Sequence, residues 1–331
     1  MRVQKFGVIG GGSWATAIVK MLSENVGCIN WWMRNEKSIE HIKIHRHNPK
    51  YIRSAEFDVA KLELSTDLKS IVEKSDVIIL ATPSAFLLSV LESLNQESFR
   101  DKMVVSAIKG IIPETNEIPA EFLIKRFNIP ENNIAMISGP CHAEEVAMER
   151  LSYLTIGSPN AQVASIVADA LSCRFIKTSV TDDLYGTEVG AILKNVFAIA
   201  SGICHGLGYG DNFQAVLMSN SIQELERFVD AISPIHRDVK SSAYLGDLLV
   251  TGYSLHSRNR RFGNLIGRGY SVRATMAEMR MIAEGYYAVK CIMDINQKHQ
   301  VNLPITEAVF HILYEETPAI TEMRNLAETL N

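Results

Sequence analysis

Cysteine is scarce in this sequence of 331 residues, and there is no excess of positive charge. Its five cysteines are odd in number, scattered, and form no C-x-x-C pair, so neither a disulfide framework nor a zinc knuckle is expected. The formal net charge of −4 leaves no general basic surface, which argues against nucleic acid as a partner. These shortages exclude disulfide-stapled and nucleic-acid-binding classes and favour reduced thiols in a cytoplasmic setting.

Signals for export or membrane insertion are missing as well. A strand is predicted almost at once at the N-terminus, with no basic-then-apolar signal segment before it. The uncharged run over residues 195–210 is too short and too rich in glycine to span a bilayer. We find no repeat of fixed period and no low-complexity segment. We therefore expect a cytoplasmic protein without integral membrane association.

The composition, in contrast, supplies enough apolar residues for two domains. Hydrophobic residues make up 47% of the chain and charged residues 21%, which is typical of a globular protein, and the length exceeds one ordinary core. In the first half, continuous apolar strands alternate with helical patterns, which indicates a doubly wound, mostly parallel sheet. The predicted strands cover residues 3–9, 28–33, 76–82, 102–108, 134–138, 153–157 and 174–178. From Glu188 onward helix follows helix, so we expect an α/β domain at 1–186 and an all-α domain at 187–331.

The first predicted strand runs directly into Gly10-Gly11-Gly12-Ser13-Trp14-Ala15, and a helical pattern follows. This is G-x-G-x-x-A between a strand and a helix, the context in which the motif indicates dinucleotide binding. Gly10 permits the tight turn, Gly12 lets the backbone approach a pyrophosphate, and Ala15 keeps helix and strand close. The N–H groups and partial positive charge of the helix N-terminus favour phosphate there. The motif therefore predicts NAD or NADP as a cofactor.

Arg34 ends the second predicted strand, where an enzyme restricted to NAD usually has Asp or Glu for the ribose 2′-hydroxyl. An arginine suits a 2′-phosphate, which favours NADP or at least its acceptance. The alternative is an arginine that merely opens the following helix. That helix also carries His41, His45 and His47, but no cysteine or carboxylate joins them. A solvated helix face is favoured there, and we expect no metal.

Further candidates follow the other predicted strands, because ligands of such sheets bind outside the carboxyl ends of the strands. They are Pro83, Lys109 and the segment Gly139-Pro140-Cys141-His142-Ala143. Lys109 is a cation at the end of an otherwise apolar strand. On position alone, it is either a ligand contact or an ordinary solvated loop lysine.

The apolar helix predicted over residues 188–206 carries one lysine, Lys194, in its middle. An ammonium ion taken out of water is costly unless it is paired or loses its proton. Lys194 therefore either snorkels to the surface or faces a ligand with a lowered pKa that suits proton transfer. Asp247, which lies among leucines, is either a helix cap or the partner of a buried cation.

A polar run, Ser257-Arg258-Asn259-Arg260-Arg261-Phe262-Gly263, lies at a predicted helix start. A solvated charged turn is one interpretation of this run. The other is a phosphate monoester site, because guanidinium and amide donors at a helix N-terminus suit that anion.

Taken together, these motifs resemble those of the bacterial NAD(P)-dependent glycerol-3-phosphate dehydrogenases. The resemblance implies a Rossmann-type domain followed by an all-helical substrate domain. It also implies interconversion of dihydroxyacetone phosphate and sn-glycerol 3-phosphate, mainly toward the phospholipid precursor, and a homodimer is the assembly we consider. The matching stretches are collinear and cover residues 10–17, 109–110, 138–140, 143–145, 190–195, 246–248, 257–263 and 284–286.

The resemblance also implies roles for single residues, with Lys194 matching the catalytic lysine and Lys109 and Asp247 assisting it. The expected substrate positions are Lys109, Gly139, Cys141, Asn195, Asp247, Thr251, Ser257, Arg258 and Asn259. With the glycine turn and Pro83 included, the expected cofactor positions are Gly10, Gly12, Ser13, Trp14, Ala15, Arg34, Pro83, Lys109, Ala143, Arg258, Ile282 and Glu284.

In this chemistry a hydride reaches the ketone carbon, and the developing alkoxide needs a proton and nearby positive charge. Lys194 would be the general acid in reduction and the base in oxidation. Asp247 would orient it and oppose the effect of desolvation on its pKa, and Lys109 would stabilise the oxyanion. Arg258 and Asn259 would hold the phosphate.

A few positions depart from the pattern of this family. Cys141-His142 stands where a hydroxyl residue and then an apolar residue are usual, so we expect no side-chain bond from Cys141 to substrate. Tyr244 replaces a usual glycine, and Gln214 replaces a usual basic residue. These changes remove no charged group that the mechanism needs.

Two other functions remain as alternatives. The first is another dehydrogenase of this two-domain plan, acting on a sugar acid or a hydroxyacyl substrate; the polar run at 257–261 argues against it. The second is an NAD(P)-binding regulator without turnover, in which the joint presence of Lys109, Lys194 and Asp247 would be a coincidence.

Overall fold

The computed structural model describes residues 4–279 and 283–330, and the chain divides into two compact units. The first unit consists of Met1–Ile108 and Pro119–Leu184, and the second of Lys109–Ile118 and Tyr185–Asn331. Each unit has its own hydrophobic core.

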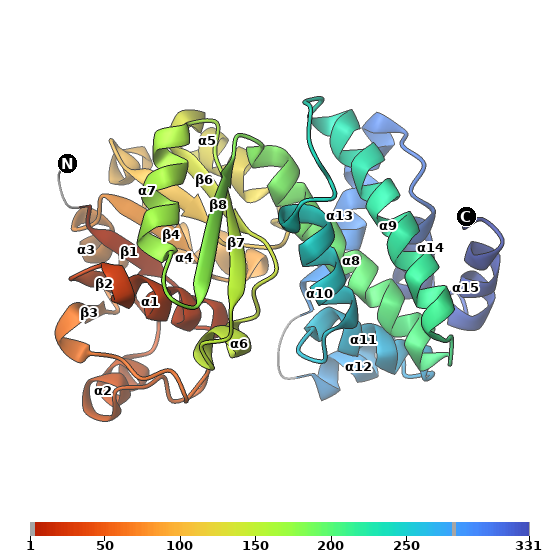
Figure 1. Cartoon of the computed structure of the whole chain (residues 1–331), viewed down its shortest axis with the longest axis horizontal. Coiled ribbons are helices and arrows are strands. Elements are labelled where there is room, and N and C mark those ends of the chain that lie inside the picture. Colours follow the sequence, from red (N-terminus) through yellow and green to blue (C-terminus); the bar gives the residue numbers. More distant parts are fainter. Residues whose placement is uncertain (1–3, 280–282, 331) are drawn as a thin grey trace. The chain divides into compact units, whose positions relative to one another are not determined.

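An eight-stranded sheet, in the order β3-β2-β1-β4-β5-β6-β7-β8, forms from the described residues of the first unit (Figure 1). Pairing is parallel from β3 through to β6, β7 runs antiparallel to β6, and β8 is parallel to β7. The strands are β1 (Phe6–Ile9), β2 (Ile29–Trp32), β3 (Leu62–Ser65), β4 (Val77–Leu80), β5 (Met103–Ser106), β6 (Ile134–Ser138), β7 (Ser152–Gly157) and β8 (Ile176–Thr181). The predicted doubly wound, mostly parallel sheet is confirmed. Strand β3 was not predicted, because its sequence, Leu-Glu-Leu-Ser, alternates apolar and polar residues and forms no continuous apolar run.

Helices and short 3₁₀ turns connect these strands. The α-helices are α1 (Ser13–Asn25), α2 (Glu36–His45), α3 (Leu68–Glu73), α4 (Leu87–Leu91), α5 (Pro119–Phe127), α6 (Ala143–Ala147) and α7 (Ala161–Leu171). The 3₁₀ turns are η1 (Val59–Lys61), η2 (Ser84–Phe86), η3 (Gln96–Phe99) and η4 (Glu131–Asn133). The segment after β4 therefore begins as the 3₁₀ turn η2 and continues as the short helix α4.

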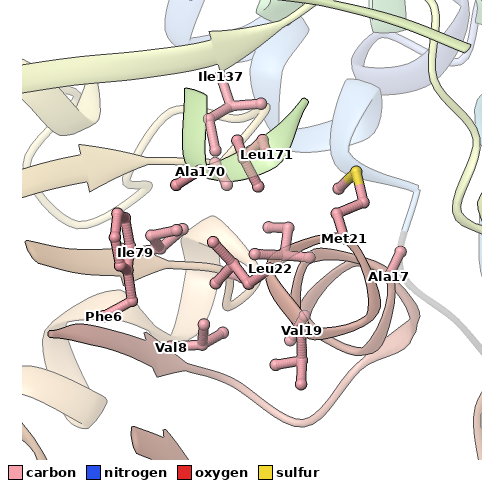
Figure 2. Packing of buried hydrophobic residues seen from close by; sticks show 14 of the residues in the cluster. Phe6, Val8, Ala17, Val19, Met21, Leu22, Ile79, Ile137, Ala170 and Leu171 are labelled. Atoms are coloured by element: carbon pink, nitrogen blue, oxygen red, sulfur yellow. The ribbon is translucent and has the colours of Figure 1, made fainter. Parts of the chain in front are cut away.

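Helix α1 is held on the sheet by the apolar face that its sequence predicts. Leu22 of α1 points toward the strands that carry Val8 and Ile79, and Leu171 of α7 belongs to the same buried cluster (Figure 2). Full burial of one such side chain contributes roughly 1.5–3 kcal/mol. This packing fixes where α1 begins, directly after β1, and so shapes the glycine turn between them.

The second unit is helical, and none of the strands formed by the described residues belongs to it. The helices are α8 (Leu184–Gly206), α9 (Asp211–Ile232), α10 (Asp247–Tyr253), α11 (Arg258–Gly267), α12 (Val272–Glu278), α13 (Glu284–His299), α14 (Pro304–Tyr314) and α15 (Ala319–Ala327), with a π-helical turn, η5 (Ser242–Gly246), before α10. The expected all-α C-terminal part is confirmed.

Helix α8 is the core helix of the second unit. By length and composition it could cross a membrane, yet 89% of its most apolar window is buried inside the structure. It is longer than the run considered from the sequence, because it begins at Leu184. Every residue from 191 to 204 is buried, including Lys194.

Helix α11 packs on α8 with direct contact between their backbones. A Cβ atom added at Gly263 of α11 would lie 2.0 Å from the Ile199 carbonyl oxygen, and one at Gly202 of α8 would lie 2.1 Å from the Arg260 carbonyl oxygen. Only glycine allows this approach. It places the start of α11, which carries Arg258 and the polar run, beside the lysine-bearing helix.

The compact units differ from the expected domains 1–186 and 187–331 at two places. The chain passes between units at Leu184 and Tyr185, and the stretch Lys109–Ile118 belongs to the helical unit. The reason is packing: Ile111 and Ile118 are buried in the helical core, and Asn116 donates a hydrogen bond to Asp294, with 3.2 Å between Nδ2 and Oδ2.

We predict that Gly263→Ala destabilises the protein by about 1–3 kcal/mol, because the added methyl group must push α11 away from α8. Urea or thermal unfolding measures this change. The matched control is Gly27→Ala, where an added Cβ meets nothing within 4 Å. Equal stability of the two variants would contradict the close packing.

Candidate active site

The turn from β1 to α1 has the backbone geometry of an anion site. Gly10 has φ of +140°, and a Cβ atom there would lie 2.4 Å from the Ala81 carbonyl oxygen, so no other residue fits. A Cβ atom at Gly12 would meet nothing within 4 Å, which leaves its surroundings open to a ligand. Ala15 is fully buried against the sheet. Gly10 and Ala15 thus have the turn and packing roles that the motif predicted, and the approach of a pyrophosphate to Gly12 stays a prediction.

The carbonyl groups of the three glycines are all held inside the protein. Gly10 O accepts a hydrogen bond from Trp31 Nε1 at 2.6 Å, and Gly11 O accepts one from Asn48 Nδ2 at 3.2 Å. Gly12 O accepts bonds from the Thr16 N–H at 3.0 Å and the Thr16 hydroxyl at 2.8 Å.

The N–H groups of the same turn are turned the other way. Within the part of the chain that the structure describes, no acceptor meets the N–H groups of Gly11, Gly12 and Ser13. No acidic residue stands in the first turn of α1. Open N–H groups at a helix N-terminus suit the pyrophosphate of a dinucleotide.

The other candidates of the first unit follow strands that end at the same edge of the sheet. Arg34, after β2, and Pro83, after β4, are exposed. Gly139, directly after β6, has φ of +103°, and a Cβ atom there would lie 2.9 Å from the Tyr153 carbonyl oxygen. Cys141 and Ala143, at the start of α6, are buried. Trp14 is half-buried in the first turn of α1, and Ile282 lies outside the described residues.

A buried ion cluster occupies the second unit. Lys194 is 4% exposed and pairs with Asp247 Oδ1. Lys109 Nζ lies 3.3 Å from Asp247 Oδ2, and the Lys109 carbonyl accepts a hydrogen bond from Asn195 Nδ2 at 2.7 Å. Lys194 therefore does not snorkel, and Lys109 is not a solvated loop lysine.

Asp247 joins the two lysines because of where α10 begins. It is the first residue of that helix, where a negative charge is favoured, and its side chain does not cap the helix. The Thr251 hydroxyl donates to the Asp247 carbonyl oxygen at 2.6 Å. Of the two interpretations of Asp247, the partner of a buried cation is correct.

The cluster shifts the pKa values of both Lys194 and Asp247. Burial lowers the pKa of Lys194 to about 7; Lys109 also lowers it, and Asp247 opposes the shift. Burial acts to raise the pKa of Asp247, but the two lysines outweigh it and hold that pKa below its ordinary value. Asp247 stays ionised, and Lys194 can hold or release a proton near neutral pH.

In the polar run at the start of α11, Ser257 and Asn259 make hydrogen bonds within the protein, and Arg258 is exposed. The Ser257 hydroxyl accepts a bond from the Arg260 N–H at 3.2 Å and caps the helix. Asn259 is buried, and its Oδ1 accepts a bond from the Gly285 N–H at 2.9 Å, next to half-buried Glu284. Arg258 is exposed at the first helical position. The Ser257 and Asn259 oxygens thus hold helix ends, and Arg258 and the Asn259 amide group are donors suited to an anion.

Sequence reasoning missed the residues that shape the glycine turn: Trp31, Asn48 and Thr16. Their local sequence gives no sign of a contact with the glycine turn, since Trp31 is predicted as a strand residue and Asn48 as the start of an Asn-Pro loop. His41, His45 and His47 do lie together, with ring centroids 4.3 Å apart for His41 and His45 and 4.9 Å apart for His41 and His47. No group of His, Cys, Asp or Glu side chains among the described residues is arranged to hold a metal ion.

A dinucleotide turn on a parallel sheet, together with a buried lysine of lowered pKa in a helical unit, defines a nicotinamide-dependent dehydrogenase class. Two family models divide the chain in the same order. The model for the N-terminus of NAD-dependent glycerol-3-phosphate dehydrogenase matches residues 5–164, and the model for its C-terminus matches residues 183–324. The chain belongs to the NAD-dependent glycerol-3-phosphate dehydrogenase family.

Individual relatives agree with the family models. A protein of Clostridium botulinum named glycerol-3-phosphate dehydrogenase [NAD(P)+] is 34% identical over 95% of this chain and 94% of its own. The solved structure of a glycerol-3-phosphate dehydrogenase from Coxiella burnetii superposes with a TM-score of 0.91 at 26% identity, covering 98% and 99% of the two chains. A 2-dehydropantoate 2-reductase from Methylococcus capsulatus, at 13% identity and a TM-score of 0.59 over 97% of each chain, shares the fold alone.

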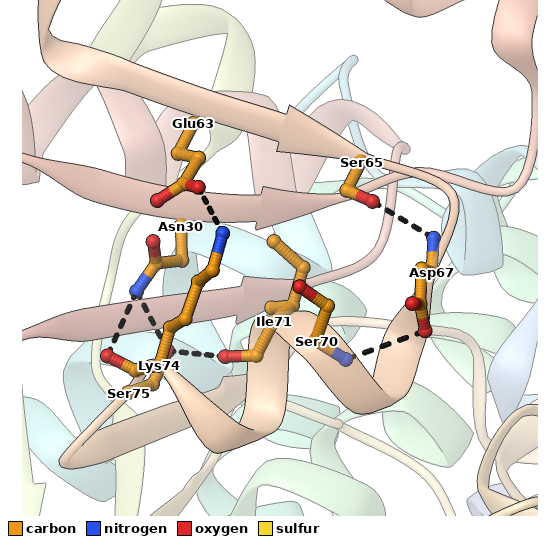
Figure 3. Close-up of polar contacts among 8 residues, drawn as sticks. All are labelled: Asn30, Glu63, Ser65, Asp67, Ser70, Ile71, Lys74 and Ser75. Carbon is orange, nitrogen blue, oxygen red and sulfur yellow. Dashed lines mark hydrogen bonds and ion pairs between the residues drawn. The ribbon is translucent and has the colours of Figure 1, made fainter.

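We predict that Asp247→Asn lowers the pKa of Lys194 further, below about 7, because the carboxylate is the group that raises it. An NMR titration of the lysine side chains measures the midpoint. The matched control is Glu63→Gln, which removes the carboxylate from the exposed ion pair of Glu63 and Lys74, with side chains 45% and 49% exposed (Figure 3). A Lys194 midpoint that stays in place or rises in Asp247→Asn would contradict the assignment.

Proposed function

We propose that this protein is an NAD(P)-dependent sn-glycerol-3-phosphate dehydrogenase that interconverts dihydroxyacetone phosphate and sn-glycerol 3-phosphate. The observation that carries the proposal is the buried cluster of Lys109, Asp247 and Lys194 in the unit that the family's C-terminal model matches. The names of relatives at 30–34% identity over nearly the whole chain support the same reaction.

Lys194 is the proton donor to the substrate oxygen in the reduction and the proton acceptor in the oxidation. A bound NAD(P)H supplies the hydride that the ketone carbon receives. A pKa of about 7 suits both directions, because general acid–base catalysis is most effective when the pKa lies near the working pH. Lys194 is held by Asp247, so the ammonium group has one orientation.

Lys109 supplies the second positive charge. Its side chain is 19% exposed, and its Nζ lies 3.3 Å from Oδ2 of Asp247, the carboxylate that also pairs with Lys194. As negative charge develops on the substrate oxygen, a fixed cation in a buried site stabilises it more than water would. Asn195 fixes the backbone of Lys109 through its carbonyl oxygen.

The substrate phosphate is bound at the start of α11. Arg258 is exposed there, the Nδ2 group of Asn259 is the donor that its bond to Gly285 leaves available, and the helix N-terminus adds partial positive charge. The remaining candidate positions, Thr251 and Gly139, contribute to the shape of the proposed substrate site. We propose no side-chain bond from Cys141.

The cofactor is NADP or NAD, with its pyrophosphate at the glycine turn and its adenosine ribose near Arg34. The open N–H groups after Gly10 and the exposed guanidinium after β2 support this placement. Ala143, Pro83 and Glu284 are proposed to line the same cofactor, and no metal takes part.

The wider setting is part of the same proposal. The product serves glycerophospholipid synthesis, the enzyme works in the cytoplasm without integral membrane association or nucleic acid, and it forms a homodimer. Light scattering coupled to size-exclusion chromatography tests the assembly.

The direct test of the proposal is NAD(P)H oxidation at 340 nm with dihydroxyacetone phosphate. We expect Lys194→Ala to lower kcat by roughly 10²- to 10⁴-fold with little change in the Kd of NADPH, because it removes general acid–base catalysis. In the wild-type enzyme, reduction should slow as the pH rises through about 7, where Lys194 loses its proton, and oxidation should accelerate. The control is Lys125→Ala, an exposed lysine paired with Glu121, which should keep full activity. Near-normal turnover of Lys194→Ala would exclude its catalytic role.

We predict that Arg34→Asp weakens NADPH about tenfold or more relative to NADH, because a charge-assisted hydrogen bond contributes roughly 1.5–3 kcal/mol. Fluorescence titration of both cofactors measures the ratio. Lys37→Asp, an exposed position in the first turn of α2, makes the same change of charge and should alter the ratio little. Equal weakening of the two cofactors by Arg34→Asp would refute its contact with the 2′-phosphate.

A further inference from the structure

Asn48 is a buried polar residue that no part of the mechanism uses. It follows α2, is 1% exposed, and its carboxamide makes four hydrogen bonds in the first unit. Nδ2 donates to Gly11 O at 3.2 Å and to Thr16 Oγ1 at 2.9 Å. Oδ1 accepts from the N–H groups of Lys50 and Tyr51 at 3.1 and 3.3 Å. One side chain thereby ties the loop after α2 to the glycine turn.

We propose that Asn48 is a positioning residue for cofactor binding, which sets the direction of the peptide between Gly11 and Gly12. In a trans peptide the C=O of one residue and the N–H of the next point in opposite directions. When Asn48 holds Gly11 O inside the protein, the N–H of Gly12 must point outward, toward the space left open at Gly12. The cofactor then meets a donor that is already aimed.

This peptide needs a fixed partner because glycine has so little preference of its own. Without side chains, Gly11 and Gly12 can take many backbone conformations, and one with the peptide reversed would present a carbonyl oxygen to the pyrophosphate. The neighbouring peptides are fixed in the same way, by Trp31 Nε1 on Gly10 O and by Thr16 on Gly12 O. Among the described residues, Asn48 is the donor that the structure assigns to Gly11 O.

The hydroxyl of Thr16 connects Asn48 to the carbonyl group of Gly12. It donates to Gly12 O at 2.8 Å and accepts from Asn48 Nδ2 at 2.9 Å, so Asn48 also orients the group that holds the next carbonyl. Removal of Asn48 therefore loosens two consecutive peptides of the turn. Both lie where the pyrophosphate is proposed to bind, and the inference rests on that proposed placement.

The effect expected from loss of Asn48 differs from the effects expected at Arg34 and Lys194. The pyrophosphate is common to both cofactors, so loss of Asn48 must weaken NADPH and NADH by the same factor, whereas Arg34 discriminates between them. Dihydroxyacetone phosphate and the chemical step do not involve Asn48. Its loss should leave kcat at saturating cofactor and the KM of the ketone substrate nearly unchanged.

The test is Asn48→Ala, with the Kd of NADPH and of NADH measured by fluorescence titration and the stability by thermal unfolding. We expect both Kd values to rise together, roughly tenfold, the change that corresponds to the loss of about one buried hydrogen bond. The matched control is Asn30→Ala on β2. Asn30 is 2% exposed, and its Nδ2 donates to one carbonyl and one hydroxyl, Lys74 O at 3.3 Å and Ser75 Oγ at 3.0 Å (Figure 3). Asn30→Ala should lower the thermal unfolding midpoint by a similar amount and leave both Kd values unchanged.

If Asn48→Ala does not fold, Asn48→Ser replaces it, because a serine hydroxyl can accept from the N–H groups two and three residues on, adds no charge, and lacks the amide donor for Gly11 O. Cofactor Kd values that change no more in the Asn48 variant than in Asn30→Ala would overturn the inference, as would unequal changes for NADPH and NADH.

A further variant separates this inference from the proposed function. Gly12→Val places a side chain in the space left open at the turn. If Gly12→Val leaves both Kd values unchanged, the pyrophosphate is bound elsewhere, and the placement and the Asn48 inference both fail. If Gly12→Val weakens both cofactors while Asn48→Ala does not, the inference about Asn48 alone fails.

Discussion

The ion pair of Lys194 with Asp247 is the interaction on which the helical unit depends. Lys194 lies on α8 within residues that are all buried, where an unpaired ammonium ion would cost several kcal/mol. Asp247 offsets that cost and also pairs with a second lysine, Lys109, at the start of the stretch Lys109–Ile118, which Ile111 and Ile118 pack into the helical core. The contact that makes burial tolerable also leaves Lys194 with a pKa of about 7, suited to proton transfer.

Backbone contact between α8 and α11 is the second constraint. Since Gly202 and Gly263 let the two helices touch, the start of α11 has little freedom to move relative to the lysine-bearing helix. Its hydrogen bonds follow from this position: Ser257 caps the helix, and Asn259 holds the N-terminus of α13 at Gly285. Residues chosen from the sequence as substrate contacts therefore also serve as supports, which keep Arg258 at an exposed helix start.

In the first unit, neutral hydrogen-bond donors fix the orientation of the peptide planes in the glycine turn. Glycine is needed at position 10, where a Cβ atom would collide with the Ala81 carbonyl oxygen, but glycine does not fix its own peptide planes. The protein fixes them from outside the motif, through Trp31, Asn48 and Thr16. A G-x-G-x-x-A motif thus predicts the turn, and residues outside the motif, from adjacent Thr16 to distant Trp31 and Asn48, hold its carbonyl groups inside the protein.

By itself, the sequence determined the class of fold, the glycine turn, the approximate positions of all strands except β3, and the helical second half. These features depend on residues close together in the chain, such as an apolar run, a glycine at a turn or a cap before a helix. Only the tertiary structure decided whether Lys194 lies at the surface or is buried, what Asp247 pairs with, and which unit holds Lys109. The partners stand 53 and 138 residues apart, and burial, which sets both the cost of a charge and its pKa, exists only once those distant segments have packed together.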